Sequence, residues 1–238
     1  MTTRNFWVVT SYYNPCGYRS RRTNYHHFQS ALKAPLLTIE LARPGHFELE
    51  DGDADLLVRV ESEDVMWHKE RLLNLSLEHL PPACTELAWV DCDVIFESEA
   101  WVDEAARALE TYPLVQCFTQ MKYLPSDFAL SMPLGAQVTS SRASLGARRQ
   151  RGEDVFTPGE ASFADAVRHG FAWGSAAGVA WCMRRATLAR SIIFPSGQVA
   201  DESSLGHPGK GGSSIEGEFM ASLWRLRYVK VPRSDRHG

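Results

Sequence analysis

The sequence predicts an α/β fold with a mostly parallel central sheet flanked by helices. Short apolar runs rich in β-branched residues alternate along the chain with segments whose apolar residues recur at helical spacing. Such alternation is typical of a parallel sheet with helices on both faces. The 238 residues are enough for one large domain with a substantial core, and no obvious linker divides them. We therefore expect a single domain over residues 1–238.

The first half of the chain carries this alternation most clearly. It opens with the apolar run F-W-V-V-T, which ends in the turn-prone stretch S-Y-Y-N-P-C-G-Y. Prolines at positions 81, 82 and 113 stop the two later helices, because proline cannot continue a helix. We expect strands at residues 6–10, 36–41, 56–60, 87–96 and 114–118, and helices at residues 23–32, 65–80 and 99–112.

The second half of the chain is less regular. Residues 123–159 lose periodicity and are rich in Ser, Gly, Pro and Arg, so we expect a long mobile loop that serves as a lid or binding loop. Beyond this loop we expect a short helix at residues 163–169, a strand at 179–183, a helix at 216–224 and a strand at 228–231.

Composition and charge exclude several classes of protein. The net charge of −4 provides no broad basic surface of the kind found in dedicated nucleic-acid binders. Five widely spaced cysteines without a C-x-x-C pair are typical of buried free thiols in a reducing compartment. The first residues lack the apolar stretch of a signal peptide, and no apolar run reaches the roughly 18 residues of a membrane span. We therefore expect a cytoplasmic protein that does not span a membrane.

The most informative motif is a pair of aspartates, Asp91 and Asp93, in the run L-A-W-V-D-C-D-V-I-F. In an extended chain both side chains point to one face while Cys92 points to the other. Two carboxylates held so close repel one another unless a cation or a proton relieves them. Oxygen ligands favour Mg²⁺ or Mn²⁺ over zinc or copper. The pair ends an apolar strand, where doubly wound proteins place ligand sites, although a metal-free surface turn is the alternative.

Four segments follow one another in a familiar order: T-S-Y-Y-N-P after the first strand, W-H-K-E-R-L-L-N, W-V-D-C-D-V-I-F, and G-V-A-W-C-M-R-R. Together they span about residues 6–190 and resemble the nucleotide-sugar glycosyltransferases of the GT-A fold, within them family 2. The Asp-x-Asp segment is the most specific of the four. The resemblance implies a nucleotide-sugar donor, most often a UDP-sugar, with Mn²⁺ or Mg²⁺ bridging the aspartates and the diphosphate.

The resemblance divides the domain into a nucleotide-binding half, residues 1–120, and a sugar- and acceptor-binding half, residues 121–238, which holds the long loop. In the first half an aromatic ring at Tyr12 or Tyr13 is expected to stack on the uracil. Arginines just after it are expected either to face the diphosphate or to form a solvated basic turn. The contacts with the donor implied in this way are Thr10, Tyr12, Tyr13, Arg19 (with Arg21 and Arg22 beside it), Arg71, Asn74, Asp91, Trp173 and Gly174.

A purely structural interpretation stays open for several of these residues. Turn tyrosines also cover a core, and Arg71 also suits an exposed charged helix face. Trp173 is expected either to stack on the sugar ring or to fill the core, while Gly174 allows the backbone to approach a ligand closely.

The catalytic base is expected in the second half of the chain. Inverting transfer needs a carboxylate that takes the proton of the acceptor. The resemblance places Asp201 and Glu202 roughly where the family has its acidic pair, although residues 191–214 depart from the family pattern. It also implies a histidine as third metal ligand, so the implied ligands are Asp91, Asp93 and His237, with His207 as the other candidate.

Two other functions fit the same sequence features. A nucleotidyltransferase shares the α/β core and paired aspartates, but it ordinarily has a Gly-rich loop after the first strand that S-Y-Y-N-P-C-G-Y-R lacks. A degenerate sugar-nucleotide or glycan-binding module is the non-enzymatic alternative. The acceptor stays open among a glycan, a lipid, a protein, a small molecule and a modified DNA base, and the sequence does not predict an oligomeric state.

Overall fold

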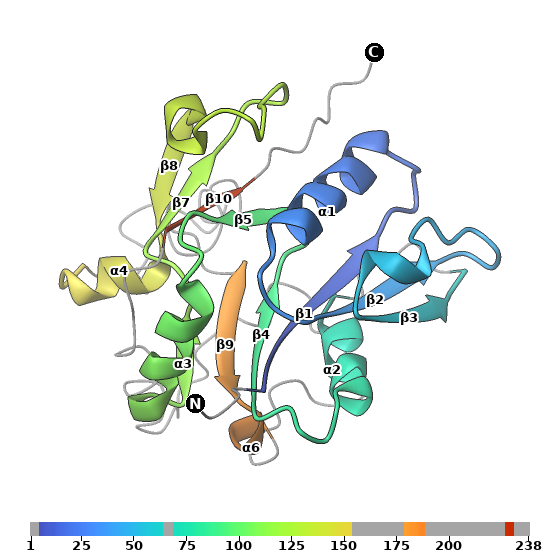
Figure 1. The fold of residues 1–238 in the computed structure, drawn as a ribbon, viewed down its shortest axis with the longest axis horizontal. Coiled ribbons are helices and arrows are strands. Elements are labelled where there is room, and N and C mark those ends of the chain that lie inside the picture. The colour runs from blue at the N-terminus through green and yellow to red at the C-terminus, as the bar shows by residue number, and fades with distance from the viewer. Residues whose placement is uncertain (1–4, 64–68, 154–178, 189–226, 231–238) are drawn as a thin grey trace, which may run out of the picture.

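The computed structural model describes residues 5–63, 69–153, 179–188 and 227–230. The elements of the large sheet and its helices are β1 (Phe6–Tyr13), α1 (Arg19–Ala31), β2 (Leu36–Ala42), η1 (Asp51–Asp53), β3 (Leu56–Glu61), α2 (Lys69–His79), β4 (Glu86–Val90), α3 (Trp101–Thr111), β6 (Leu114–Gln116), β9 (Ala180–Arg184) and α6 (Arg185–Leu188). The sheet has six strands in the order β3-β2-β1-β4-β9-β6 (Figure 1). Strands β1 to β4 are parallel, whereas β9 is antiparallel to both neighbours. The predicted mostly parallel α/β fold is confirmed.

A second, smaller sheet packs beside the first. It consists of β5 (Val94–Phe96), β10 (Arg227–Lys230), β7 (Gln120–Tyr123) and β8 (Ser140–Ala143), in that order (Figure 1). Two short helical segments lie near it in the chain, η2 (Leu134–Gln137) and α4 (Leu145–Gln150). Since β4 belongs to the large sheet and β5 to the small one, the three residues between them connect the two sheets.

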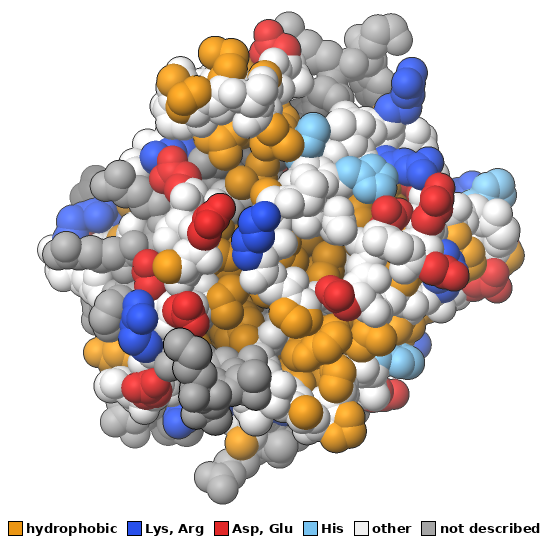
Figure 2. Space-filling model, in the orientation of Figure 1, with side chains coloured by type: hydrophobic (Ala, Val, Ile, Leu, Met, Phe, Trp, Pro, Cys, Tyr) orange, Lys and Arg blue, Asp and Glu red, His pale blue; other side chains and the backbone are white. Residues whose placement is uncertain are grey.

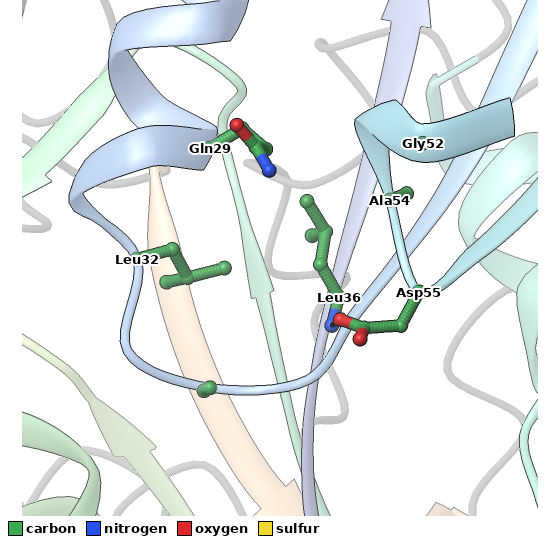
Figure 3. A pocket seen from close by; sticks show the side chains of 7 residues that line it. Gln29, Leu32, Leu36, Gly52, Ala54 and Asp55 are labelled. Atoms are coloured by element: carbon green, nitrogen blue, oxygen red, sulfur yellow. Dashed lines mark hydrogen bonds between the residues drawn. The ribbon is translucent and has the colours of Figure 1, made fainter. Parts of the chain in front are cut away.

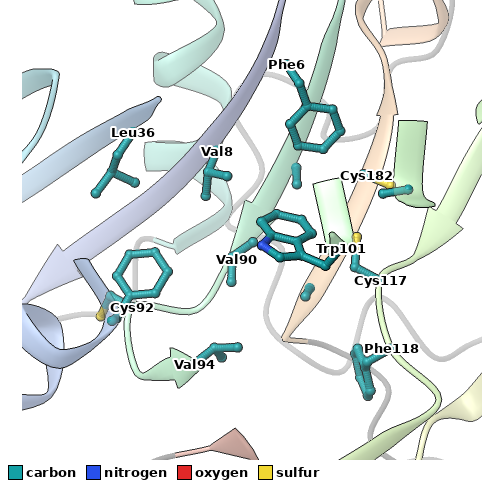
Figure 4. Close-up of a cluster of buried hydrophobic side chains, with 14 of the residues drawn as sticks. Phe6, Val8, Leu36, Val90, Cys92, Val94, Trp101, Cys117, Phe118 and Cys182 are labelled. Atoms are coloured by element: carbon teal, nitrogen blue, oxygen red, sulfur yellow. The ribbon is translucent and has the colours of Figure 1, made fainter. Parts of the chain in front are cut away.

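The strand β1 is buried on both faces because its side chains alternate between two cores. Phe6, Val8 and Tyr12 pack with residues of α1 and α3, whereas Val9 packs with α2. A strand covered by helices on both sides reads as a continuous apolar run, as F-W-V-V-T does. Figure 4 shows the first core, where Trp101 of α3 lies among side chains of β1 and β4. Its ring meets that of Phe6 edge-on at 5.8 Å.

The predicted elements of the first half are confirmed with shifted ends. The helix expected at residues 23–32 begins earlier, at Arg19, and the strand expected at residues 6–10 continues to Tyr13. The strand expected over residues 87–96 is wrong as one element, because β4 ends at Val90 and residues 91–93 form a turn. A turn is needed there because the chain passes from one sheet to the other.

The expectation of a long loop at residues 123–159 is wrong over residues 134–150, which contain η2, β8 and α4. Strand β8 pairs with β7 through its backbone, but the first three of its four side chains are exposed. Without a buried face it produces no apolar periodicity for sequence reasoning to detect. The strands expected at 179–183 and 228–231 match β9 and β10, whereas the helices expected at 163–169 and 216–224 lie outside the described residues.

The surface and the thiols agree with the composition. Acidic and basic side chains are interspersed over the face in Figure 2, without a contiguous basic field. All five cysteines are free thiols, and four of them are buried, with Cys16 the exposed exception. Within the described ranges, none of the helices has the length and apolar character required to cross a bilayer.

Candidate functional site

The order of the strands marks where a ligand site can form. The chain moves from β1 outward to β2 and β3, and then returns to the other side of β1 to form β4. At such a reversal the loops after the two central strands diverge and leave a crevice at their carboxyl ends. The segments that leave β1 and β4 at this edge are the turn after Tyr13 and the Asp-Cys-Asp turn.

The Asp-Cys-Asp turn is held in place by hydrogen bonds on two sides. The hydroxyl of Thr10 in β1 donates to the carbonyl oxygen of Val90 at 2.6 Å. The backbone N–H of Asp91 donates to the carbonyl oxygen of Val179 at 2.8 Å. Val179 has a φ of 87°, a strained backbone for a β-branched residue, and such strain is concentrated at functional sites.

Cys92 anchors the turn in the core. Its side chain is buried in the same cluster as Tyr12 and Tyr25. Burial raises the pKa of this thiol to about 12, and the neighbouring charge of Asp93 adds to the rise. The thiol therefore stays protonated at neutral pH and serves as an apolar anchor rather than as a nucleophile.

The two carboxylates of the turn lie among positive charges. Lys69, the first residue of α2, donates from its Nζ to the Oδ1 of Asp91. Asp93 is buried, with 9% of its surface exposed. The positive charges of Arg21, in α1, and of Lys69 both lower the pKa of Cys92. Two carboxylates from the turn and the ammonium from α2 thus meet at the end of β4.

A divalent cation fits this donor set in part. Magnesium-type sites in proteins use one or two carboxylates and take the remaining oxygens from phosphates and water. Asp91 and Asp93 provide the two carboxylates, and they are two residues apart in a turn held from both sides. In the described part of the chain, no group of three or more His, Cys, Asp and Glu side chains could hold a metal ion.

A polar cavity of about 470 Å³ lies next to this edge, between the turn after β1 and the segment after β2. Glu48 in its wall accepts hydrogen bonds from the phenol of Tyr12 and, at 2.8 Å, from the amide of Asn14. Glu40 of β2 also lines the cavity and is 1% exposed. Its Oε1 accepts the backbone N–H of Glu48 at 2.6 Å, and Arg59 lies 3.9 Å from its Oε2.

The buried groups of this cavity have shifted pKa values. Burial is the largest cause of the raised pKa of Glu40, and the backbone hydrogen bonds and Arg59 oppose it. Burial also raises the pKa of Tyr12 above its ordinary range, and the hydrogen bond and charge of Glu48 add to this. The phenol of Tyr12 is therefore a hydrogen-bond donor at neutral pH and not an acid.

A smaller cavity of about 160 Å³ lies at the opposite edge of the sheet (Figure 3). Gln29, Leu32 and Leu36 line it, and the carboxylate of Asp55 accepts the backbone N–H of Leu36 at 2.7 Å. Leu36 begins β2 and Asp55 precedes β3, so this cavity is at the amino ends of the strands. Doubly wound sheets bind ligands at the other edge, and this cavity is a structural feature of the fold.

The structure places the predicted donor contacts of the first half as follows. Thr10 and Tyr12 are buried in the sheet, and the ring of Tyr12 meets that of Tyr25 edge-on at 5.3 Å. Tyr13 is half-buried and packs against the core on the α2 side, which is the opposite face from Tyr12. Arg19 and Arg71 are exposed on α1 and α2, and Asn74 is half-buried. The expected contacts of the second half, Trp173, Gly174, Asp201, Glu202, His207 and His237, lie outside the described residues.

Three residues of this edge were missed by sequence reasoning. Lys69 lies in the segment W-H-K-E-R-L-L-N without a predicted role, but it contacts Asp91. Glu40 and Glu48 had no role at all. For Glu40 a signal exists, because a glutamate inside the apolar run L-L-T-I-E-L-A must be buried with partners.

The chain is similar to known proteins in structure but not detectably in sequence. No protein-family model matches the chain, and no curated protein is significantly similar to it in sequence. The fold is similar to TarS from S. aureus, solved with UDP-GlcNAc, at 14% identity and a TM-score of 0.46, over 98% of this chain and 60% of that one. It is also similar to glucosyl-3-phosphoglycerate synthase from Mycobacterium tuberculosis, solved with Mn²⁺, UDP and phosphoglyceric acid, at 13% identity and a TM-score of 0.43, over 99% and 72%.

A third similar structure is the mannosyltransferase PcManGT from Pyrobaculum calidifontis, solved with GDP-Man and Mn²⁺, at 19% identity and a TM-score of 0.32. That match covers 48% of this chain and 36% of the mannosyltransferase. The predicted likeness to nucleotide-sugar transferases is confirmed, and the chain spans less than two thirds of two of these three proteins.

Proposed function

We propose that the protein is a glycosyltransferase that moves a sugar from a nucleotide sugar, a UDP-sugar by first choice, with a divalent cation bound by Asp91 and Asp93. The observation that carries this proposal is the position of the two carboxylates. They lie in a turn at the carboxyl end of β4, beside β1, where the strand order reverses. This is the edge at which doubly wound sheets bind ligands.

The chemistry of sugar transfer explains why charged groups gather there. The nucleoside diphosphate leaves with developing negative charge, which a Mn²⁺ or Mg²⁺ ion neutralises as a Lewis acid when it is bound. Asp91 and Asp93 hold and orient that ion. Arg21, whose charge already reaches the turn, is suited to a phosphate oxygen because the guanidinium is a strong donor to anions.

The polar cavity beside Tyr12 is the proposed place of the nucleoside. Glu40 and Glu48 offer acceptors for the N–H groups of a base, and Asn14 offers a donor. Tyr12 contributes its phenol rather than its ring face, because the ring is buried against Tyr25 and the hydroxyl positions Glu48. This modifies the stacking role expected for Tyr12.

The roles of the second half are proposed from the resemblance alone. Asp201 or Glu202 is the base that takes the acceptor's proton with inversion at the sugar, and His237 completes the metal ligands. Trp173 and Gly174 contact the sugar. Single substitutions Asp201→Asn and Glu202→Gln test the base, because the true base variant keeps donor binding and loses transfer.

Nucleotide release tests the proposal as a whole. The protein is incubated with UDP- and GDP-sugars and Mn²⁺, and the affinity for UDP with Mn²⁺ is measured by calorimetry. We expect Asp93→Ala to weaken that affinity on the order of 100-fold and to leave the fold intact, because a first ligand of the ion is lost. Asp127→Ala, which removes an exposed carboxylate from a loop, is the matched control and should leave affinity and release unchanged.

The outcomes separate the competing functions. Unchanged affinity in Asp93→Ala would remove the metal assignment. Donor binding with neither hydrolysis nor transfer from any acceptor pool supports the binding module. Pyrophosphate release from a nucleoside triphosphate and a sugar phosphate identifies a nucleotidyltransferase, which uses the same edge of the sheet for a different leaving group.

A further inference from the structure

The ion pair between Lys69 and Asp91 has a consequence for metal binding. The ammonium of Lys69 contacts the Oδ1 of Asp91, and the two side chains are only 25% and 20% exposed. A pair shielded from solvent to this degree is less screened by salt than a surface pair. We propose that Lys69 is the resident counter-ion of Asp91 and that a divalent cation must displace it to bind there. This inference rests on the proposed function only for the existence of the metal site.

The two cations compete for the same carboxylate. Lys69 contacts the Oδ1 of Asp91, and a Mn²⁺ or Mg²⁺ ion about 2.1 Å from an oxygen of that carboxylate would lie close to the ammonium. If both stayed, two positive charges would lie next to each other in a site with little solvent, at a large electrostatic cost. Arg21 adds a further positive charge near the turn. Metal entry therefore requires that Lys69 move away.

This exchange couples the metal to the nucleotide. A cation that arrives alone has to displace Lys69 and meets the positive field of Arg21. A cation that arrives with a diphosphate brings its own negative charge, and the displaced ammonium then gains a new partner. The wild-type protein should thus bind Mn²⁺ alone weakly and bind Mn²⁺ with UDP strongly.

The test measures binding of Mn²⁺ directly, without any activity. Free Mn²⁺ is followed by electron paramagnetic resonance as it is titrated into the protein, first alone and then with UDP. We expect Lys69→Met to bind Mn²⁺ alone on the order of tenfold more tightly than wild type, because the competing charge is gone. Lys69→Arg should not tighten binding, since it keeps the charge. Lys33→Met, the same substitution at an exposed lysine after α1, is the control.

The same substitution made in a second variant, Asp91→Asn, separates an effect on metal binding from a folding defect. Asp91→Asn removes the partner of Lys69, so adding Lys69→Met to that variant should no longer tighten binding at the remaining carboxylate. Circular dichroism reports whether each variant is folded. If Lys69→Met leaves the charge of Asp91 uncompensated and so unfolds the protein, the double variant Asp91→Asn, Lys69→Met should be folded again. The Mn²⁺ affinity of the wild type is then compared with that of Lys69→Gln.

Each outcome decides the matter. Wild type and Lys69→Met could bind Mn²⁺ with equal affinity, and Asp93→Ala could abolish that binding in both. This result overturns the role of Lys69 as a counter-ion but leaves the proposed metal site standing. If UDP binds without metal and Lys69→Met abolishes this binding, Lys69 takes the place of the metal. This result also overturns the proposal that a cation displaces Lys69. No Mn²⁺ binding by either protein, even with UDP, overturns both this inference and the metal in the proposed function.

Discussion

Polar side chains have different partners at the two ends of the parallel sheet. At the amino end, polar side chains satisfy the backbone, as when Asp55 accepts the N–H of Leu36 and Arg185 donates to the carbonyl of Pro81 at 2.6 Å. At the carboxyl end, charged side chains instead face one another, as Lys69 faces Asp91. The larger cavity is also at the carboxyl end, with about 470 Å³ against about 160 Å³. The amino end thus pairs side chains with the backbone, whereas the carboxyl end gathers charged side chains beside the larger of the two cavities.

The largest effect on stability is expected at the amino end, from Arg185→Met. The guanidinium donates to the carbonyl oxygens of Pro81 and Leu77 and closes the end of α2. Its loss should lower the free energy of unfolding by about 2 kcal/mol, because hydrogen bonds from charged groups are strong. Urea unfolding measures this. Arg184→Met, at the exposed neighbouring position, is the control, and both variants should bind UDP with Mn²⁺ like wild type. If Arg185→Met but not Arg184→Met loses affinity for UDP, the amino end also affects ligand binding and the contrast between the two ends is contradicted.

An intermediate effect is expected at the carboxyl end, from Thr10→Val. This change is close to isosteric and removes the hydroxyl that donates to Val90 just before the Asp-Cys-Asp turn. We expect a loss of about 1 kcal/mol of stability and, unlike at the amino end, weaker binding of UDP with Mn²⁺ by several-fold. Thr23→Val on exposed α1 serves as the control. If Thr10→Val changes stability alone, the bond to Val90 does not position the turn.

The smallest effect is expected from Glu40→Gln, and it depends on pH. Burial raises the pKa of Glu40 in the folded protein, so the wild type loses stability as the pH rises from the ordinary pKa of a glutamate through the folded pKa. The amide cannot ionise and keeps the Oε1 acceptor for the N–H groups of Glu48 and Leu49. The stability of Glu40→Gln relative to wild type should therefore increase from pH 4 to pH 8. Denaturant unfolding at the two pH values checks this, and a constant difference would contradict it.

The contrast between the two ends could be foreseen only in part. The Asp-Cys-Asp segment was predicted to follow an apolar strand, and β4 does end just before it, at Val90. Its extended conformation was not borne out, because the next strand belongs to another sheet. Lys69 is 22 residues before Asp91 in sequence, and no local pattern links them. Glu48 likewise meets Tyr12 only because β1 and β2 are neighbours.

The sequence by itself determined the strands and helices of the first half, because residues buried on both faces of a strand leave a continuous apolar run, and helices leave a periodic one. It also determined which carboxylates could act together, since Asp91 and Asp93 are two residues apart. Only the tertiary structure decided which charges surround them. Such contacts join segments distant along the chain, and their energies depend on burial and distance, which come into being when the sheet and helices pack.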